Sequence, residues 1–413
     1  MKIIRTEQIF IRDNGTVSKM CHISKNLFNQ TNYILRNQFF NHNRMSSYKT
    51  LAKQFAEPSA LEENNNFQKL PAQTAQWTIK KVKESWTSFF GALRSYKKNP
   101  ELFNGVPKPP KYKHKNGEFM LVFTNQQCSI DDGILKFPKI MDLEVETRLG
   151  NVNLREVRVI PLDVGYNVEI VYSKEIDAPS ELSPKRILGI DVGVRNIITI
   201  GNNISEKGIA VKGGVLKSIN QHFNKKLAKL KSINDRQRKN KENTKRIDNL
   251  YMVRNRKIRD VMHKISNAVI AYAITNEIDT IAIGHNNGWK QSVDIGKKNN
   301  QNFVQIPFNM LINQIYYKGL EHNINVIIQE ESYTSKCSFL DNETIEEHET
   351  YLGKRIKRGI FKSSNGTLIH ADLNASYNII KKAIPEAFDG IEGIGLYPGS
   401  LSIKEMITSK GGC

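Results

Sequence analysis

The stretch ILGIDVGVRNIITIG, residues 187–201, decides the fold of this chain. It is apolar enough for two buried strands joined by a tight turn. Asp191 lies inside it, with Gly189 and Gly193 close by on either side. A buried carboxylate is costly unless it is paired or binds a metal, and the glycines leave room for a metal or a phosphate to approach. Asp191 is therefore expected to be a metal ligand, with the cap of a strand-end turn as the alternative.

The segments after this stretch alternate between strand and helix. Residues 280–283 (TIAI) and 326–328 have the length of buried strands, and residues 308–320 and 371–383 have the apolar spacing of helices. The order strand, strand, long helical region, strand, helix, strand, helix is typical of an α/β domain of the RNase H type. We expect this domain at residues 181–390, followed by a tail at 391–413.

A long basic segment, residues 217–264, lies within this domain. It holds sixteen Lys or Arg and four acidic residues, and it contains few turn-forming residues. These features predict a helical hairpin whose charge faces nucleic acid. The side chains expected to bind there are Lys225, Lys226, Arg236, Arg238, Arg254 and Arg256.

The chain before residue 181 has a different character. The segment 178–185 (APSELSPK) reads as a linker. A strand-like run at 2–11 comes first, and apolar residues recur at helical spacing over 70–93, with Lys80 and Lys81 at other positions of that helix. Short alternating runs at 119–124, 134–137, 157–161 and 166–172 predict a small sheet or barrel.

Between the helix and these strands lies GVPKPPKYKHK, residues 105–115. Its prolines exclude the interior of a helix or strand. Lys108, Lys111 and Lys113 suit contact with phosphates, and Tyr112 suits stacking on a base or sugar. A charged surface loop without a ligand is the alternative.

The bulk composition points to a polyanionic partner. The net charge is +20 and the isoelectric point is near 9.6. No apolar run approaches the roughly 18 residues of a membrane span, and the N-terminus lacks the apolar core of a secretory signal. We expect a cytoplasmic protein that does not bind membranes. The four cysteines form no CxxC pair, which argues against a disulfide framework.

Several motifs resemble those of TnpB, the transposon-encoded RNA-guided nuclease related to type V CRISPR effectors. GIDVGVRN (189–196) and HADLNASYNI (370–379) are similar to its first and third RuvC motifs. ESYTSKC (331–337) resembles the segment that leads into its zinc ribbon. The segment 70–90 resembles its N-terminal helical region, and PKPPKYK (107–113) the basic stretch that follows. The resemblance runs from about residue 1 to residue 385.

The resemblance implies a fold and a mode of action. The fold is a wedge-like β-barrel within residues 1–180, with a helical recognition domain inserted at about 20–110, followed by the RuvC domain. The partners are a guide RNA with a structured scaffold and a double-stranded target DNA, whose sequence is read by base pairing. Asp191 and Asp372 bind two Mg²⁺ ions, or Mn²⁺ in their place. From the residues alone, Asp372 could instead be a helix N-cap. The sequence leaves monomer or dimer open.

One departure from the family pattern concerns the second RuvC motif. The family has a glutamate at the end of the TIAI strand, and Gly284 stands there in this chain. Glu330 and Glu331 follow the next predicted strand, and paired strands lie about 4.8 Å apart. We expect one of these two glutamates to be the relocated third ligand, since adjacent strand residues face opposite ways. The alternative is that both glutamates are solvated acids at a strand end and bind no metal. Asn286, or a water held by His285, is a weaker candidate for the third ligand.

A second departure concerns the zinc ribbon. Cys337 stands alone in the insert 336–366, and one cysteine with His348 cannot build a closed zinc site. We therefore predict no zinc. Lys354 and Arg355, in KRIKRGIFK, can still contact phosphate, with a charged loop as the alternative.

The motifs together predict an RNA-guided DNA endonuclease. A cleavage-deficient RNA-guided DNA-binding protein is the main alternative, because Gly284 removes one ligand. A nuclease that acts on structured DNA without a guide is disfavoured. Such an enzyme needs little beyond its catalytic domain, and it would not account for the large basic part of this chain before residue 181.

Overall fold

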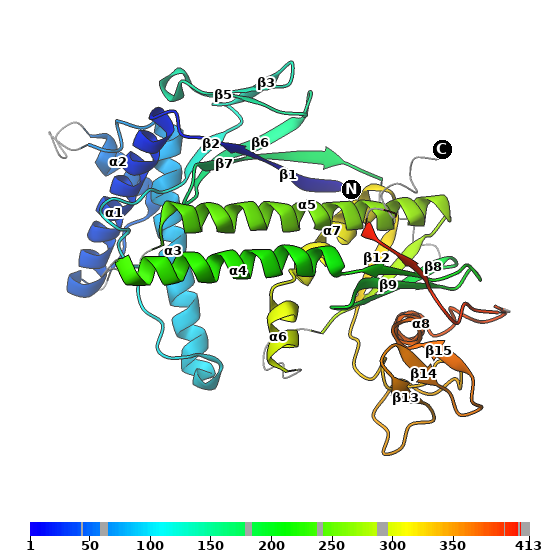
Figure 1. Ribbon diagram of the computed structural model, residues 1–413. Helices are drawn as coiled ribbons and strands as arrows, with labels where there is room; N and C mark the ends of the chain where they lie inside the picture. Colours follow the sequence, from blue (N-terminus) through cyan, green and yellow to red (C-terminus); the bar gives the residue numbers. More distant parts are fainter. Residues whose placement is uncertain are drawn as a thin grey trace. The chain divides into compact units, whose positions relative to one another are not determined.

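The computed structural model describes residues 1–42, 44–57, 65–177, 184–237, 243–286, 296–391, 393–403 and 405. The chain divides into two compact units, one of residues 2–175 and one of residues 176–413 together with Met1 (Figure 1). The structure is a mixture of helices and strands in both units, as the sequence predicts.

The unit 2–175 begins with one strand, continues with helices and ends with a run of strands. In chain order these are β1 (Lys2–Ile11), α1 (Thr16–His42), α2 (Tyr48–Ala56), α3 (Ala72–Lys98), the short η2 (Pro100–Leu102), β2 (Leu121–Thr124), β3 (Ser129–Asp131), β4 (Ile134–Lys136), η3 (Lys139–Met141), β5 (Glu144–Glu146), β6 (Asn153–Pro161) and β7 (Tyr166–Glu175).

The strands of this unit form two sheets within the described residues. One has the order β1-β7-β6-β2 and the other the order β3-β4-β5, and all of their pairs are antiparallel. β1 pairs with β7 along its whole length, from Lys2 opposite Glu175 to Ile11 opposite Tyr166. The helices α1–α3 therefore lie, in sequence, between two strands of one sheet.

The proline-rich segment is held on α1 by side chains from one face of that helix. The amide of Asn29 donates to the carbonyl of Lys113 at 2.9 Å, and its oxygen accepts from the Lys113 amide at 2.8 Å. Asn32 and Arg36 both donate to the carbonyl of Pro110, at 3.1 and 2.9 Å. Because prolines cannot donate hydrogen bonds, this segment depends on α1 for its fixed path.

The unit 176–413 is built on a sheet of six strands. Its elements in chain order are β8 (Ile187–Val192), β9 (Asn196–Asn202), β10 (Ile209–Lys212), α4 (Gly214–Gln237), α5 (Lys245–Thr275), β11 (Thr280–Gly284), α6 (Lys297–Val304), α7 (Phe308–Glu321), β12 (Asn325–Gln329), β13 (Lys354–Lys357), β14 (Ile360–Lys362), β15 (Leu368–His370), α8 (Ala371–Ala383) and β16 (Gly399–Leu401).

The order of this sheet places three strand ends together. The order is β12-β11-β8-β9-β10-β16, and β11 is parallel to both β8 and β12. The carboxyl ends of β8, β11 and β12 therefore lie at one edge of the sheet, which is where α/β proteins place their ligands. β9 is antiparallel to β8, and the tight turn predicted between them is confirmed.

Helix α8 packs closely against the sheet, and Gly189 permits this contact. A Cβ on Gly189 would lie 2.3 Å from the carbonyl oxygen of Ser376 and 2.6 Å from Ile380. The Ser376 hydroxyl donates to the Gly189 carbonyl at 2.7 Å. The expectation that Gly189 leaves room for a metal or phosphate is therefore wrong, because α8 fills that room.

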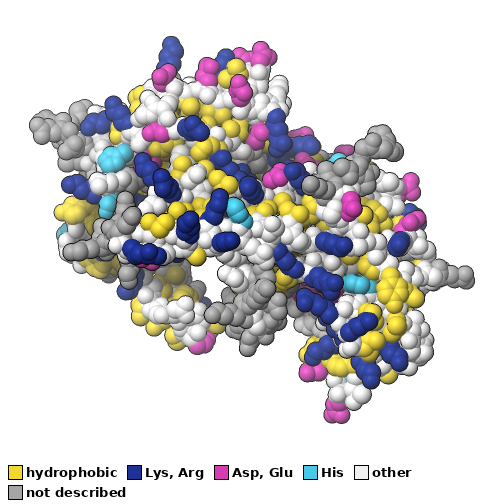
Figure 2. All heavy atoms as spheres, viewed as in Figure 1, with side chains coloured by type: hydrophobic (Ala, Val, Ile, Leu, Met, Phe, Trp, Pro, Cys, Tyr) yellow, Lys and Arg dark blue, Asp and Glu magenta, His cyan; other side chains and the backbone are white. Residues whose placement is uncertain are grey.

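The basic hairpin predicted at 217–264 consists of α4 and α5, which run side by side (Figure 1). One face of α5 is buried in the core through Ile258, Met262, Ile265 and Val269. Lys and Arg side chains are spread over this hairpin in the space-filling view (Figure 2). None of the described helices is long and apolar enough to cross a membrane.

The insert 336–366 contains β13 and β14, which form a small sheet with β15 just after the insert. The buried carboxylate of Glu343 accepts from the amides of Ser338, at 2.6 Å, and Leu352, at 2.9 Å. Asn374 and Asn378 of α8 both donate to the carbonyl of Cys337, at 2.9 and 2.8 Å. Hydrogen bonds from side chains to the backbone thus close the segment 338–352 and hold Cys337 against α8.

Candidate active site

Asp191, Asp372 and Glu331 come together at the carboxyl ends of the parallel strands. Asp191 is the fifth of the six residues of β8, Asp372 is in the first turn of α8, and Glu331 lies two residues after the end of β12. Both Asp372 and Glu331 act on the charge of Asp191. Three carboxylates from distant parts of the chain therefore share one electrostatic environment.

Asp191 is held in an environment that opposes its charge. Burial raises the pKa of its carboxyl group well above the usual value, and the nearby carboxylates of Asp372 and Glu331 raise it further. Arg355 opposes this shift. A strand residue under such repulsion favours a cation as its partner.

Asp372 is not the N-cap of α8. His370 occupies the cap position, with extended backbone angles, and Asp372 is the second residue of the helix. The Asn196 amide donates to Asp372 Oδ2 at 3.0 Å, and an Arg355 guanidinium nitrogen lies 3.5 Å from Asp372 Oδ1. The positive end of the helix dipole stabilises a carboxylate in this first turn.

Glu331 fills the space that the missing side chain of Gly284 leaves. One oxygen of its carboxylate, Oε2, would lie 2.7 Å from a Cβ on Gly284, and Ile379 would lie 2.5 Å from the same point. The amide of Glu331 donates to Asn286 Oδ1 at 3.0 Å. Burial raises the pKa of Glu331 to about 7, with Glu330 as the next cause.

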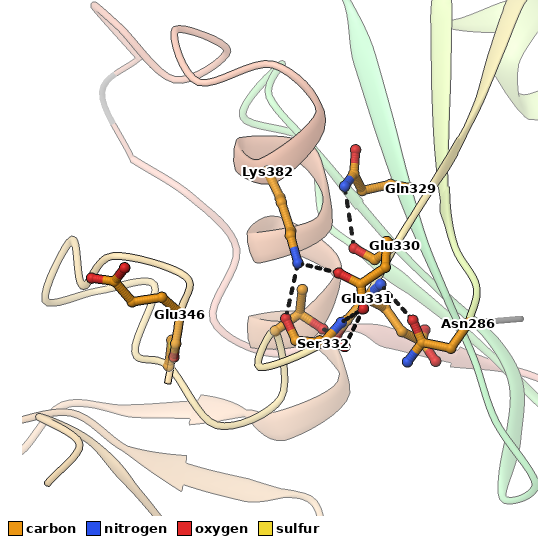
Figure 3. A network of polar contacts seen from close by, with 9 residues as sticks. Asn286, Gln329, Glu330, Glu331, Ser332, Glu346 and Lys382 are labelled. Atoms are coloured by element: carbon orange, nitrogen blue, oxygen red, sulfur yellow. Dashed lines mark hydrogen bonds and ion pairs between the residues drawn. The ribbon is translucent and has the colours of Figure 1, made fainter. Parts of the chain in front are cut away.

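Glu330 is engaged elsewhere, in the network of Figure 3. Its Oε2 accepts from Lys382 Nζ at 2.6 Å, and its Oε1 accepts from the amide of Ser332 at 2.8 Å and from the Ser332 hydroxyl. The hydrogen bonds from Lys382 and Ser332 lower the pKa of Glu330 to about 2. Two adjacent glutamates thus have opposite surroundings, and only Glu331 appears among the groups that shift Asp191.

A cavity of about 170 Å³ opens beside Asp191 and Asp372. Its lining includes side chains that the sequence reasoning missed, namely Arg195, Asn196, Arg358 and His370. Arg195 and Asn196 belong to the first motif and His370 to the third, so their position within these motifs is the sequence feature that could have identified them as site residues. Arg358 belongs to the basic run 354–362 that is predicted to contact phosphate, but only the folding of the insert brings it to the cavity. Burial is the main cause of the lowered pKa of Lys217, and the nearby charges of Arg358 and Arg195 lower it further.

The carboxylates are not arranged at metal-binding spacing. Among the described residues, no group of three His, Cys, Asp or Glu side chains is set to hold a metal ion. An Arg355 guanidinium nitrogen lies 3.5 Å from Asp372 Oδ1 instead, and the carboxylates of Asp372 and Glu331 disfavour the charge of Asp191.

The basic residues predicted to bind nucleic acid lie in both units. The exposed ones are Lys108, Lys111, Tyr112, Lys225, Lys226, Arg236, Lys354 and Arg355, and the half-buried ones are Lys80, Lys81, Lys113, Arg254 and Arg256. Arg238 lies outside the described residues. Arg254 donates to Asn220 Oδ1 and to the carbonyl of Gln305, so much of its hydrogen-bonding capacity joins α4, α5 and the segment before α7.

Cys337 is buried, and its thiol donates to the carbonyl of Glu346 at 3.6 Å. His348 bonds to Thr344 instead, with its Nε2 2.9 Å from the Thr344 carbonyl. The expectation of no zinc remains a prediction.

Comparison with known proteins gives two family models and a curated relative. Residues 166–290 match the model described as OrfB_IS605, a probable transposase, and residues 308–379 match the model described as Cas12f1-like, TNB domain. The TnpB-like protein ORF457 of Acidianus two-tailed virus is 24% identical, over 92% of this chain and 87% of its own.

The fold is also similar to that of a solved structure. In the Cas12f1–sgRNA–target DNA complex, the protein is 13% identical, with a TM-score of 0.54, and the match covers 90% of this chain and 83% of the other. At this identity the likeness shows the fold alone. The two family models, the relative and the shared fold confirm the resemblance seen in the motifs: the chain is similar to TnpB-type proteins.

Proposed function

We propose that this protein is an RNA-guided DNA endonuclease with a RuvC-type, RNase H-like active site. The observation that carries the proposal is the grouping of Asp191, Asp372 and Glu331 at the carboxyl ends of β8, β11 and β12. Hydrolysis of a phosphodiester by two metal ions needs such converging carboxylates. Asp191, Asp372 and Glu331 are the proposed metal ligands. Glu330 is proposed instead to stabilise the chain turn that follows β12, through its contacts with Ser332 and Lys382.

The donor set fits Mg²⁺ or Mn²⁺. All three side chains offer carboxylate oxygens, the ligands that these hard cations prefer. Burial is the main cause of the raised pKa values of Asp191 and Glu331, and neighbouring carboxylates add to it, so the ionised forms of both gain from neutralisation by a cation. Bound divalent ions would supply that neutralisation and the activation of water for attack on phosphorus.

The residues around the cavity suit the other half of the task, which is to hold a phosphate. Arg195, Arg355 and Arg358 line the same cavity as Asp191 and Asp372. Arginine presents several donors in a fixed geometry that matches phosphate oxygens. When a phosphate enters, we expect Arg355 to exchange its contact with Asp372 for the phosphate, which frees Asp372 for a cation.

We assign residues 2–175 to recognition of nucleic acid. This unit carries Lys108, Lys111 and Tyr112 exposed on the segment that α1 holds in place. The interpretation of its strands as a wedge-like barrel, with α1–α3 as the inserted helical domain, rests on the resemblance to TnpB. The proposed partners are a structured guide RNA and a double-stranded target DNA, as in the complex that the similar Cas12f1 structure contains.

A cleavage-deficient RNA-guided DNA-binding protein is the second candidate. Two observations favour it: Gly284 offers no side-chain ligand, and Arg355 lies 3.5 Å from Asp372, where it can neutralise that carboxylate without a metal. Such a protein would act by occupying its target.

One assay separates these two functions. The protein is co-expressed with the RNA encoded beside its gene, and the complex is incubated with a plasmid target library and Mg²⁺. Guide-dependent cutting that Asp191→Asn abolishes, while guide-dependent binding persists, supports the endonuclease. If the wild type binds in a guide-dependent way but does not cut in either Mg²⁺ or Mn²⁺, the result supports the cleavage-deficient DNA-binding protein and overturns the endonuclease.

A further inference from the structure

A group of exposed aromatic rings lies at the C-terminal half of α1 and on the proline-rich segment. Tyr33, Phe40 and Tyr112 are 58, 60 and 49% exposed. Tyr33 and Phe40 share one face of α1 with Arg36, at spacings of three and four residues. Large rings gathered at one exposed place on a protein commonly mark a binding surface.

Arg36 orders two of these rings into a stack. Its guanidinium carbon lies 5.4 Å from the centre of the Phe40 ring and 5.5 Å from the centre of the Tyr112 ring. The same guanidinium donates to the carbonyl of Pro110 at 2.9 Å, which fixes its position. The two rings are thus held in place before any ligand arrives, and less conformational entropy is lost on binding.

A cavity of about 300 Å³ opens beside the neighbouring ring, Phe39, whose centre is 5.0 Å from that of Phe40. Trp86 and Phe90 line it with Phe39 and pack against that ring at ring-centre distances of 5.4 and 5.6 Å, in tilted and edge-on contacts. Two cations, Lys83 and Arg44, line the same cavity. A volume near 300 Å³ is at the lower end of the range of small-ligand pockets.

We infer that the cavity formed by Phe39, Trp86 and Phe90 binds an unpaired base of the RNA, whose neighbouring base stacks on the Phe40–Arg36–Tyr112 group. Aromatic and guanidinium planes are the surfaces on which unpaired bases stack. Lys83 and Arg44 then contact the phosphates that join these nucleotides. The net charge of +20 favours such a polyanion over an apolar peptide.

The choice of RNA follows from what each nucleic acid exposes. The bases of duplex DNA are stacked inside the helix, whereas loops and bulges of a structured RNA offer unstacked bases. Burial lowers the pKa of Lys83, which places this ammonium partly away from water, where a phosphate oxygen is a favourable partner. The inference rests on the proposed function only in taking the guide RNA as the source of the strand.

The test uses the full-length Asp191→Asn protein and short single-stranded RNA that carries 2-aminopurine, a base whose fluorescence falls when it stacks. Binding is measured without DNA, so it does not depend on cutting. Phe90→Leu and Tyr112→Leu keep an apolar side chain and remove the ring, and each is expected to weaken binding about fivefold to a hundredfold and to restore fluorescence. Tyr316→Leu, at an exposed tyrosine of α7, is the matched control.

A charge variant adds an independent readout. Lys83→Gln is expected to lower the slope of log affinity against log salt concentration by about one, the effect of one lost phosphate contact. Equal loss in Tyr316→Leu, unquenched 2-aminopurine, or equal quenching by single-stranded DNA of the same sequence would overturn the assignment. So would a dimer of the free protein that Phe40→Leu or Tyr112→Leu dissociates, because the rings would then be an interface. Guided cutting that persists alongside a negative result here would leave the endonuclease intact.

Discussion

One carboxylate oxygen of Glu331 lies 2.7 Å from the point where a Cβ on Gly284 would stand. The TnpB family has a glutamate at the Gly284 position, so an acid from the neighbouring segment reaches the space that this side chain would have occupied. β11 and β12 are parallel neighbours, with Gly284 opposite Gln329. The two strands therefore end side by side, and a residue just past β12 can replace one at the end of β11.

The two adjacent glutamates are expected to differ sharply in mutagenesis. Glu331→Gln should lower the rate of DNA cutting at least about a hundredfold, because a lost metal ligand costs more than the 10- to 100-fold of an outer-shell residue. Glu330→Gln keeps a similar shape and should stay within a few-fold of wild type. The measurement is the single-turnover rate in Mg²⁺. An equal loss of cutting rate in both variants would show that the structure of the turn after β12 is required, and not the Glu331 carboxylate itself.

Gly284 is expected to tolerate no side chain. A Cβ there would meet Ile379 at 2.5 Å as well as Glu331, so Gly284→Ala should destabilise the protein by about 1–3 kcal/mol, the usual cost of overpacking. Thermal unfolding and the cutting rate check this.

Moving the glutamate from position 331 to position 284 is a sharper test of the same contact. The double variant Gly284→Glu with Glu331→Gly should not regain cutting, because Ile379 occupies the space that a side chain at position 284 needs. Adding Ile379→Ala should restore part of the activity. Full activity in the double variant alone would contradict the steric argument.

Stability without metal is expected to fall as the pH rises from about 4.5 to about 7. The pKa of Glu331 is about 7 in the folded protein against an ordinary 4.5, so the folded state binds this proton more tightly than the unfolded chain. The resulting stabilisation is complete below about pH 4.5 and is lost as the pH rises to about 7, for a total of roughly 1–3 kcal/mol.

Denaturant unfolding in EDTA across this pH range measures the effect. Glu331→Gln should flatten the dependence, and Mg²⁺ should oppose it in the wild type by binding the ionised form. The raised pKa of Asp191 acts in the same direction. A wild-type stability that rises from pH 4.5 to 7 in EDTA, relative to Glu331→Gln, would contradict the prediction.

The insert 336–366 is expected to keep its shape without zinc. Its segment 338–352 is closed by Glu343, whose carboxylate accepts from the amides of Ser338 and Leu352. Glu343→Ala leaves both amides without this acceptor, and we expect a loss of about 1–3 kcal/mol. Elemental analysis of the purified protein should find no stoichiometric zinc, and hydrogen exchange should show local opening in the variant only. Stoichiometric zinc, or unfolding of the insert by a chelator, would refute this.

Two kinds of basic residue on the α4–α5 hairpin are expected to behave differently. Lys225 and Lys226 are exposed, so Lys225→Gln with Lys226→Gln should weaken RNA binding and lower its salt slope by about two. Arg254 bonds to Asn220 and Gln305, so Arg254→Gln should mainly lower the unfolding temperature. The reverse pattern would assign Arg254 to the nucleic acid.

Much of the fold follows from local pattern. The apolar runs of ILGIDVGVRNIITIG and TIAI predicted β8, β9 and β11, and the spacing of apolar residues over 371–383 predicted α8 at its observed bounds. Period and turn residues are local properties, so a sequence can specify them without reference to the rest of the molecule. The resemblance to TnpB was likewise available from short motifs, and the comparisons confirm it.

What the sequence by itself determined is the set of candidate acids: Asp191, Asp372, and either Glu330 or Glu331. The tertiary structure decided how the two glutamates differ, because Lys382 of α8 pairs with Glu330 while Glu331 reaches the space beside Gly284. It also brought Arg358 to the cavity and filled the space at Gly189 with α8. Each of these depends on contacts between segments far apart in the chain, and neither spacing nor composition carries that information.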